Sequence, residues 1–116
     1  MISSEEAQKA ICTKYGVLWT EAPNHMKVGV ALNVKSHIVP INGVRHPQEG
    51  DTTGWYIWAG TGDMPSDPSF FVPLHVEHLP EWRPEVAKYL GLPPGWRFQI
   101  DGDYEDVWQD LGLLDV

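Results

Sequence analysis

The sequence predicts an α+β fold, in which a small, mostly antiparallel sheet packs against an N-terminal helix and a second short helix. Two observations indicate the sheet. Residues 54–60 form an apolar run between two glycines, and apolar side chains alternate with polar or small ones along residues 28–34 and 96–100. A third observation, the helical spacing of apolar residues along 4–14 and 84–90, predicts the two helices.

The N-terminal helix is expected over residues 4–14, because Ser3 and Glu6 have the spacing of a capping box at its start. The short apolar run 17–20 is read as a strand. Residues 28–34 alternate between valine or leucine and smaller or polar residues, which is the pattern of a strand with one buried face.

Residues 54–60 are expected to be the central strand. In an extended backbone Trp55 and Ile57 would face one side, while Tyr56 and Trp58 would face the other. A strand that is apolar on both sides must be covered on both faces by other elements. We therefore expect the core of the protein to be built around this strand.

The segment 36–53 shows no periodicity and is too polar to be read as core. Asn42 and Gly43 could close a type I′ hairpin between residues 38–39 and 44–45. A long loop is the alternative interpretation of the same segment.

The C-terminal half is predicted as a loop at 62–68, a helix that begins at Pro84 and ends near Leu90, and a strand over 96–100. Pro94 and Gly95 match the central positions of a type II turn before that strand. The acidic end of the chain is read as a short helix or turn that Trp108 and the following leucines dock onto the domain.

The chain has 116 residues, the length of a single domain (1–116), with 8 basic and 16 acidic residues and a formal net charge of −8. This charge argues against binding to nucleic acid, which requires clustered lysine and arginine, and favours a basic partner; the simpler reading is that it keeps the protein soluble. We expect no membrane partner, because no apolar run approaches the roughly 18 residues of a membrane span. Since the first residues lack the features of a secretory signal, we expect a cytoplasmic protein.

Chemical motifs are sparse. His75, Glu77 and His78 are the best candidates for metal ligands, but the spacing is loose and neither a cysteine pair nor a third histidine lies near them in sequence. A small metal-dependent hydrolase that uses His75, His78 and nearby carboxylates is the alternative function. The sequence contains no phosphate-binding loop, nucleophile elbow or cysteine–histidine signature, so no common enzyme class has local support.

Five segments of the C-terminal two thirds together resemble a known family: GWYIWAG at 54–60, FF at 70–71, PLHVEHL at 73–79, LPPGWRF at 92–98 and YEDVW at 104–108. The chain resembles the family numbered thirty-three among the immunity proteins of bacterial polymorphic toxin systems, chiefly over residues 54–110. The resemblance implies a compact α+β protein without catalytic residues or cofactors, which binds and neutralises a cognate toxin in the cell that produces it.

The acidic C-terminal stretch is the predicted binding surface for that toxin. Toxins that act on nucleic acid are basic at their substrate cleft, so an acidic inhibitor could imitate phosphate and attract the toxin over long range. Exposed aromatic residues would supply the anchor that charge alone seldom provides. The alternative is that these acids only solvate the chain end. The predicted binding residues are Asp101, Asp103, Tyr104, Glu105, Asp106, Asp110 and Trp82.

Overall fold

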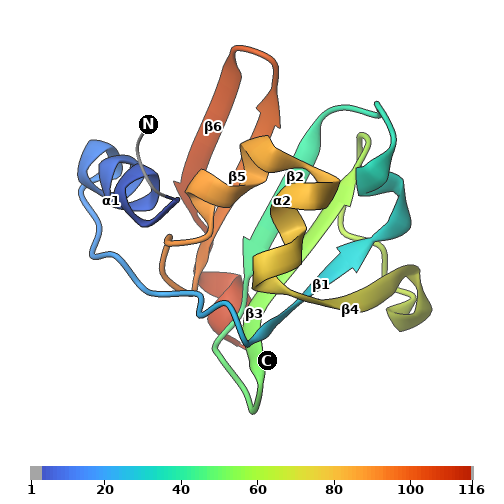
Figure 1. Ribbon diagram of the computed structural model, residues 1–116, viewed down its shortest axis with the longest axis horizontal. Helices are drawn as coiled ribbons and strands as arrows, with labels where there is room; N and C mark the ends of the chain where they lie inside the picture. Colours follow the sequence, from blue (N-terminus) through green and yellow to red (C-terminus); the bar gives the residue numbers. More distant parts are fainter. Residues whose placement is uncertain (1–3, 116) are drawn as a thin grey trace.

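The computed structural model describes residues 4–115, and a twisted six-stranded sheet runs through its centre (Figure 1). The strand order is β4-β1-β3-β2-β5-β6. Only β1 and β3 pair in parallel within this sheet, and the other neighbouring strands are antiparallel, as predicted. The strands are β1 (Lys27–Ala31), β2 (Ile41–Arg45), β3 (Thr52–Ala59), β4 (Phe71–His75), β5 (Trp96–Asp101) and β6 (Tyr104–Gln109).

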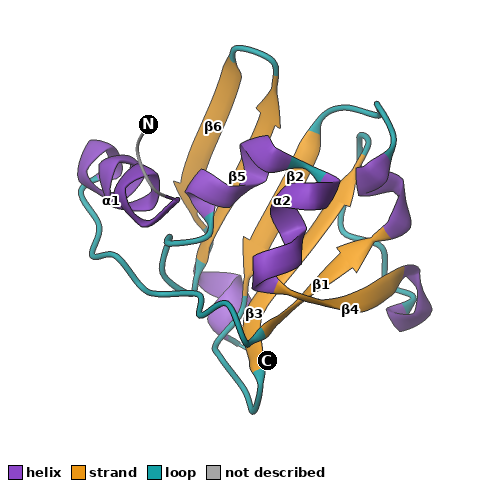
Figure 2. Cartoon of the chain, in the orientation of Figure 1, coloured by secondary structure: helices purple, strands orange, loops and turns teal. Residues whose placement is uncertain are grey.

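The longer helical segments lie on one side of this sheet (Figure 2). The predicted N-terminal helix is confirmed as α1 (Ser4–Tyr15), and Ser3 of the predicted capping box lies outside the described residues. The other α-helix is the single turn α2 (Leu79–Trp82). Short 3₁₀ helices complete the described chain: η1 (Leu32–Lys35), η2 (Pro68–Phe70), η3 (Val76–His78), η4 (Pro84–Tyr89) and η5 (Leu111–Leu114).

The helix predicted over residues 84–90 is the 3₁₀ helix η4, and α2 precedes it as a separate turn. The two are interrupted at Arg83, whose backbone is extended, with φ of −157° and ψ of 92°. A residue before proline favours this conformation, because the proline ring clashes with a helical neighbour. No helix among residues 4–115 combines the length and apolar character needed to cross a membrane.

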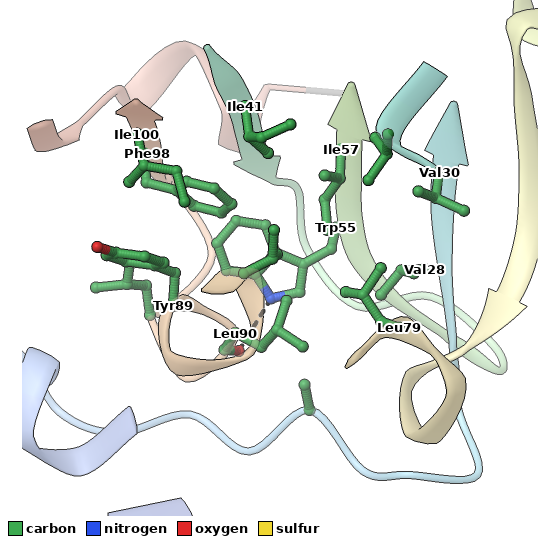
Figure 3. Packing of buried hydrophobic residues seen from close by; sticks show 14 of the residues in the cluster. Val28, Val30, Ile41, Trp55, Ile57, Leu79, Tyr89, Leu90, Phe98 and Ile100 are labelled. Atoms are coloured by element: carbon green, nitrogen blue, oxygen red, sulfur yellow. Dashed lines mark hydrogen bonds between the residues drawn. The ribbon is translucent and has the colours of Figure 1, made fainter. Parts of the chain in front are cut away.

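Trp55 on β3 is the centre of the main core, as Figure 3 shows. Its side chain is 1% exposed, and its indole Nε1 donates a hydrogen bond of 3.0 Å to the Leu90 carbonyl oxygen. The Phe98 ring lies 5.5 Å from the Trp55 ring, and the Tyr89 ring stacks on Phe98 at 4.9 Å. Residues of α1, α2 and η4 thus close over one face of the sheet, which we call the helical face.

The opposite face of β3 carries Tyr56 and Trp58, as predicted, and we call it the second face. Trp58 is 2% exposed and belongs to a smaller apolar cluster with Ala31, Val44 and Leu113. Leu113 comes from η5, so the chain end contributes to the cover of this face. Both faces of the central strand are covered, and the prediction made for residues 54–60 is confirmed.

The predicted hairpin around Asn42 and Gly43 is wrong, because these residues lie inside β2, between β3 and β5. All of β2 is buried, so the reading of residues 36–53 as too polar for the core, and as one long loop, is also wrong there. Asn42 Nδ2 donates to the Gly60 carbonyl oxygen at 2.8 Å, and its Oδ1 accepts from Gln99 at 2.9 Å. Gly43 leaves room for the Phe98 ring, since a Cβ atom there would lie 2.2 Å from Phe98 Cε2.

The strand predicted at residues 17–20 is also wrong, because this segment is irregular. Its backbone groups bond outside the sheet: the Thr20 amide donates to the Gly91 carbonyl oxygen at 2.8 Å. The Thr20 and Glu21 carbonyl oxygens accept from the guanidinium of Arg45 at 2.9 and 3.1 Å.

Arg45, at the end of β2, is fully buried. It donates to backbone carbonyls of three separate segments: Thr20 and Glu21, Thr53, and Leu90 and Leu92. Burial lowers its pKa to about 10, so the side chain stays charged near neutral pH. The carbonyl dipoles stand in for the water that the guanidinium loses on folding.

The acidic end of the chain differs from the prediction as well. Residues 104–109 form β6, an edge strand, rather than a helix or turn, and only the leucine-rich end is helical, as η5. The strand predicted over residues 28–34 ends at Ala31, where η1 begins and keeps Val34 buried. The type II turn is supported by the φ of +91° at Gly95 and by a 3.2 Å bond from the Trp96 amide to the Pro93 carbonyl oxygen.

Candidate functional site

The β5–β6 hairpin carries most of the predicted binding residues (Figure 1). Asp101 and Tyr104 are its last paired residues, which leaves Gly102 and Asp103 as a two-residue loop. Gly102 has a φ of +58°, whereas Asp103 does not adopt a positive φ. Glycine in this conformation at the first loop position is typical of a type II′ turn, whose twist suits a hairpin.

Pairing in the sheet decides which face each acidic residue occupies, since directly opposed residues share a face. Asp106 pairs with Gln99, and Tyr104 pairs with Asp101. Gln99 pairs with Asn42, which in turn pairs with Trp58 of the second face. Asp101, Tyr104 and Asp106 therefore belong to the second face.

Four predicted residues are exposed together at this end of the hairpin. Tyr104 is 52% exposed and places its hydroxyl 3.5 Å from Asp106 Oδ2. Asp101, Asp103 and Asp106 are exposed carboxylates around it. We call these four residues, Asp101, Asp103, Tyr104 and Asp106, the hairpin tip.

Glu105 differs from its neighbours because it points to the helical face. Its carboxylate accepts hydrogen bonds from Lys14 at 2.7 Å, Tyr15 at 2.5 Å and Tyr89 at 2.5 Å, and its side chain is 16% exposed. Burial would raise the pKa of Glu105, but the bonds from Lys14, Tyr15 and Tyr89 outweigh it and lower that pKa to about 2. The charge of Glu105 is thus used within the protein to join β6 to α1 and η4.

Tyr89 donates a hydrogen bond from its hydroxyl to the Glu105 carboxylate. Burial and the bond to Glu105 together raise the pKa of Tyr89, so the phenol keeps its proton at every ordinary pH. A protonated phenol can donate, and an ionised carboxylate can only accept, which fixes the direction of the bond.

Asp110 and Trp82 also lie apart from the hairpin tip. Asp110 accepts from Arg97 at 3.0 Å and from the Gly112 amide at 3.1 Å, so it caps η5. Trp82 is half-buried on α2, packs against the main core and lies under the Lys35 ammonium at 4.2 Å from the ring centroid. The fold therefore brings together four of the seven predicted binding residues.

The histidine pair is not part of a metal-binding cluster. His75 ends β4 and His78 ends η3, with their ring centroids 6.3 Å apart. His78 Nδ1 lies 2.9 Å from Glu81 Oε2 on the exposed surface. Within residues 4–115, no group of three histidine, cysteine or acidic side chains is placed to hold a metal ion, so the alternative hydrolase gains no ligand set from the fold.

A groove of about 520 Å³ lies at the other end of the sheet and was not predicted. It is lined by Gly29, Gly54 and Tyr56 of the sheet, and we call it the sheet groove. The surrounding side chains come from β1, β3, β4 and the loops near residues 46–49 and 64–66, and include Lys27, His46, Pro47, Glu49, Met64, Pro65, Ser66, Phe71 and Pro73. The sequence signal for this groove is Gly29, a glycine within a strand pattern, because such a glycine often marks a site where another group approaches the backbone closely.

A comparison with protein families matches the Imm33-like domain over residues 7–110. The chain belongs to the Imm33-like domain family. No curated protein and no solved structure matches it. The Imm33-like domain begins at the second turn of α1 and ends just after β6, so it includes every strand of the described sheet. The resemblance noted from sequence was chiefly to residues 54–110, and the match extends it to nearly the whole chain.

Proposed function

We propose that this Imm33-like protein is a non-enzymatic immunity protein, which binds a cognate toxin in the cytoplasm of the producing bacterium and blocks its activity. Membership of the Imm33-like family is the observation that carries the proposal. The partner is a basic toxin, and inhibition follows from covering the toxin's functional surface.

The hairpin tip is the proposed contact with the toxin. Asp103 lies in the two-residue turn, Asp101 ends β5 and Asp106 lies on the edge strand β6, and all three side chains are exposed. Tyr104 lies among them with half of its surface exposed, and tyrosine is one of the residues that most often anchor an interface. This arrangement places an aromatic anchor inside a charged rim, as a partner of opposite charge requires.

Charge elsewhere on the molecule supports the same contact. Every lysine and arginine contacts a carboxylate, an aromatic ring or backbone carbonyls, so none is left as a separate basic surface among residues 4–115. The contacts join Lys9 to Glu5, Lys14 to Glu105, Lys27 to Asp51, Arg83 to Glu85, Arg97 to Asp110, Lys35 to Trp82, Lys88 to Tyr89, and Arg45 to carbonyls.

Charge reversal at the tip tests the proposal. Asp103→Lys combined with Asp106→Lys should leave the melting temperature nearly unchanged, because both side chains are exposed. Association with the toxin encoded by the adjacent gene should slow about tenfold or more at low salt, and its rate should depend less on salt. Stopped-flow mixing over a range of ionic strengths measures both effects. Glu105 is left unchanged, because its carboxylate is bonded within the fold.

The control is a second double variant with the same change in net charge. Glu21→Lys combined with Glu81→Lys alters two exposed acids away from the hairpin. Equal slowing in both double variants would show that net charge alone steers association. If the wild-type protein neither binds the toxin nor protects against it, the immunity function itself is wrong.

A further inference from the structure

The sheet groove lies far from the hairpin tip along the strands. Asp101 follows Ile100, which pairs through Ile41 with Ala59 at the end of β3. The groove surrounds the start of β3, at Thr52, Gly54 and Tyr56. Its volume of about 520 Å³ is in the range of about 300–1,000 Å³ that is typical of ligand sites. A partner bound at the hairpin tip can therefore leave the sheet groove accessible to a second ligand or side chain.

Two glycines in the lining let neighbouring groups lie directly on the sheet. Gly54 has a φ of +92°, and a Cβ atom there would lie 1.9 Å from the His46 carbonyl oxygen. At Gly29 a Cβ atom would lie 2.8 Å from Tyr56 Cδ1, so the Tyr56 ring rests directly on this bare strand position. The two glycines therefore fix the positions of the His46 backbone and the Tyr56 ring, which are parts of the groove wall.

Three aromatic rings lie side by side in the lining of the groove. The His46 and Tyr56 rings are 5.5 Å apart at 77°, and the Tyr56 and Phe71 rings are 5.4 Å apart at 80°. In such edge-to-face contacts the ring edges meet ring faces, and all three residues still line the groove. The negative face of a phenol or phenyl ring attracts a cation, and arginine is the cation most often found there.

The charges around the groove select the sign of its ligand. Lys27 is the basic side chain of the lining, and its ammonium lies 2.9 Å from Asp51 Oδ2, which offsets its charge. Glu49 adds a carboxylate to the wall. With Lys27 offset by Asp51, the charge left in the lining is that of Glu49, in a protein of net charge −8, so a cation is favoured over an anion.

We propose that the sheet groove receives an arginine side chain of the protein partner, with the guanidinium against Tyr56 and Phe71 and within reach of Glu49. The proposal rests on the proposed function for the source of that side chain, which is the toxin. The sheet groove would be a second binding site for the toxin, separate from the hairpin tip, and it would recognise a single basic side chain and not the overall charge of the toxin.

A titration without any toxin tests this step by itself. The ¹⁵N-labelled protein is titrated with N-acetyl-arginine amide and, separately, with N-acetyl-citrulline amide, which has nearly the same shape but no charge. Chemical shifts of the Gly29, Gly54 and Tyr56 amides should move, and arginine should bind about two- to fivefold more tightly than citrulline. Amides of the hairpin tip should move little.

A matched pair of variants locates the charge that matters. Glu49→Gln should reduce the affinity for N-acetyl-arginine amide about two- to fivefold, a loss of the size expected for a partly exposed ion pair or cation–π contact. Glu21→Gln removes the same charge from an exposed site outside the groove lining and should leave the affinity unchanged.

Three results would overturn the assignment: equal binding of arginine and citrulline, shifts confined to other parts of the surface, or the absence of shifts up to the solubility limit of the amide. None of them depends on the toxin. Failure of the groove proposal is thus distinguishable from failure of the immunity function, which the toxin-binding measurement alone decides.

Discussion

At the scale of single residues, Glu105 shows how one carboxylate can serve the fold while its neighbours serve the surface. Asp103 and Asp106 are exposed, whereas Glu105 bonds Lys14, Tyr15 and Tyr89. Its lowered pKa has a direct consequence for stability. A carboxyl group that is more acidic in the folded state stabilises the protein above its unfolded pKa of about 4.3, and this contribution is lost as the pH falls towards about 2.

We therefore expect Glu105→Gln to lower the free energy of unfolding by about 1.5–3 kcal/mol near neutral pH, the value of a hydrogen bond to a charged group. The difference from the wild type should shrink between about pH 4.5 and pH 2, because the wild-type carboxylate becomes protonated there. Urea unfolding at several pH values measures it. Asp103→Asn, at an exposed site, is the control, and a difference that persists unchanged at low pH would contradict the role given to this carboxylate.

At the scale of secondary-structure elements, β2 is a strand that the sequence pattern did not predict. An asparagine followed by a glycine, as at Asn42 and Gly43, is a pair of residue types typical of a tight turn. Nothing local in the sequence shows that the Asn42 amide bonds Gly60 and Gln99 or that Phe98 covers Gly43. The contacts that stabilise β2 as a strand are made with segments distant in the sequence. The segment Trp96–Asp101 was found as a strand because its alternation is visible within the segment itself.

The hairpin and the groove likewise combine features that are visible in the local sequence with features that depend on contacts between distant segments. The acids of β6 were selected from composition, but whether each points to the helical or the second face depends on pairing with β5, which sequence spacing alone leaves open. The alternation of Val107 and Glu105 against Trp108 and Asp106 was available as a signal for a strand. The groove needs Gly29 of β1 beside Tyr56 of β3, a juxtaposition of neighbouring strands that only the fold creates.

Packing at Gly43 provides a test at this scale. Gly43→Ala should destabilise the protein by about 1–3 kcal/mol, the usual cost of overpacking, because the added methyl group meets the Phe98 ring. The same change in a Phe98→Leu background should cost less than half as much, since the ring atoms that cause the clash are absent. A double-mutant cycle by denaturant unfolding measures the coupling. Equal costs in both backgrounds would show that Gly43 is required for another reason.

At the scale of the whole molecule, the net charge argues against binding to nucleic acid. The formal net charge is −8, and the lysine and arginine side chains are engaged with carboxylates, rings or carbonyls of the described chain. Binding to DNA gains free energy by releasing the counterions of phosphates, which requires accessible cations. The lysine and arginine side chains of residues 4–115 are each engaged in contacts within the protein, so the surface favours cationic partners at both of the sites proposed for it.

We accordingly expect no retardation of duplex DNA in a gel at micromolar protein and ordinary salt, and no gain when the salt concentration is lowered moderately. Fluorescence anisotropy with a labelled duplex gives an independent measurement in solution. Retardation that weakens steeply with added salt would reveal a phosphate-binding surface and would contradict this account of the charges.

Arg45 connects segments that are distant in the sequence through one side chain. The connection after α1 has no strand of its own, and its path at Thr20 and Glu21 follows from the guanidinium, which also fixes the carbonyls of Leu90 and Leu92. Because Arg45 ends β2, its side chain is in place only when β2 lies between β3 and β5. The path of the segment at Thr20 and Glu21 is thus coupled to the pairing of β2 in the middle of the sheet, so a change that displaces β2 would also release this connection.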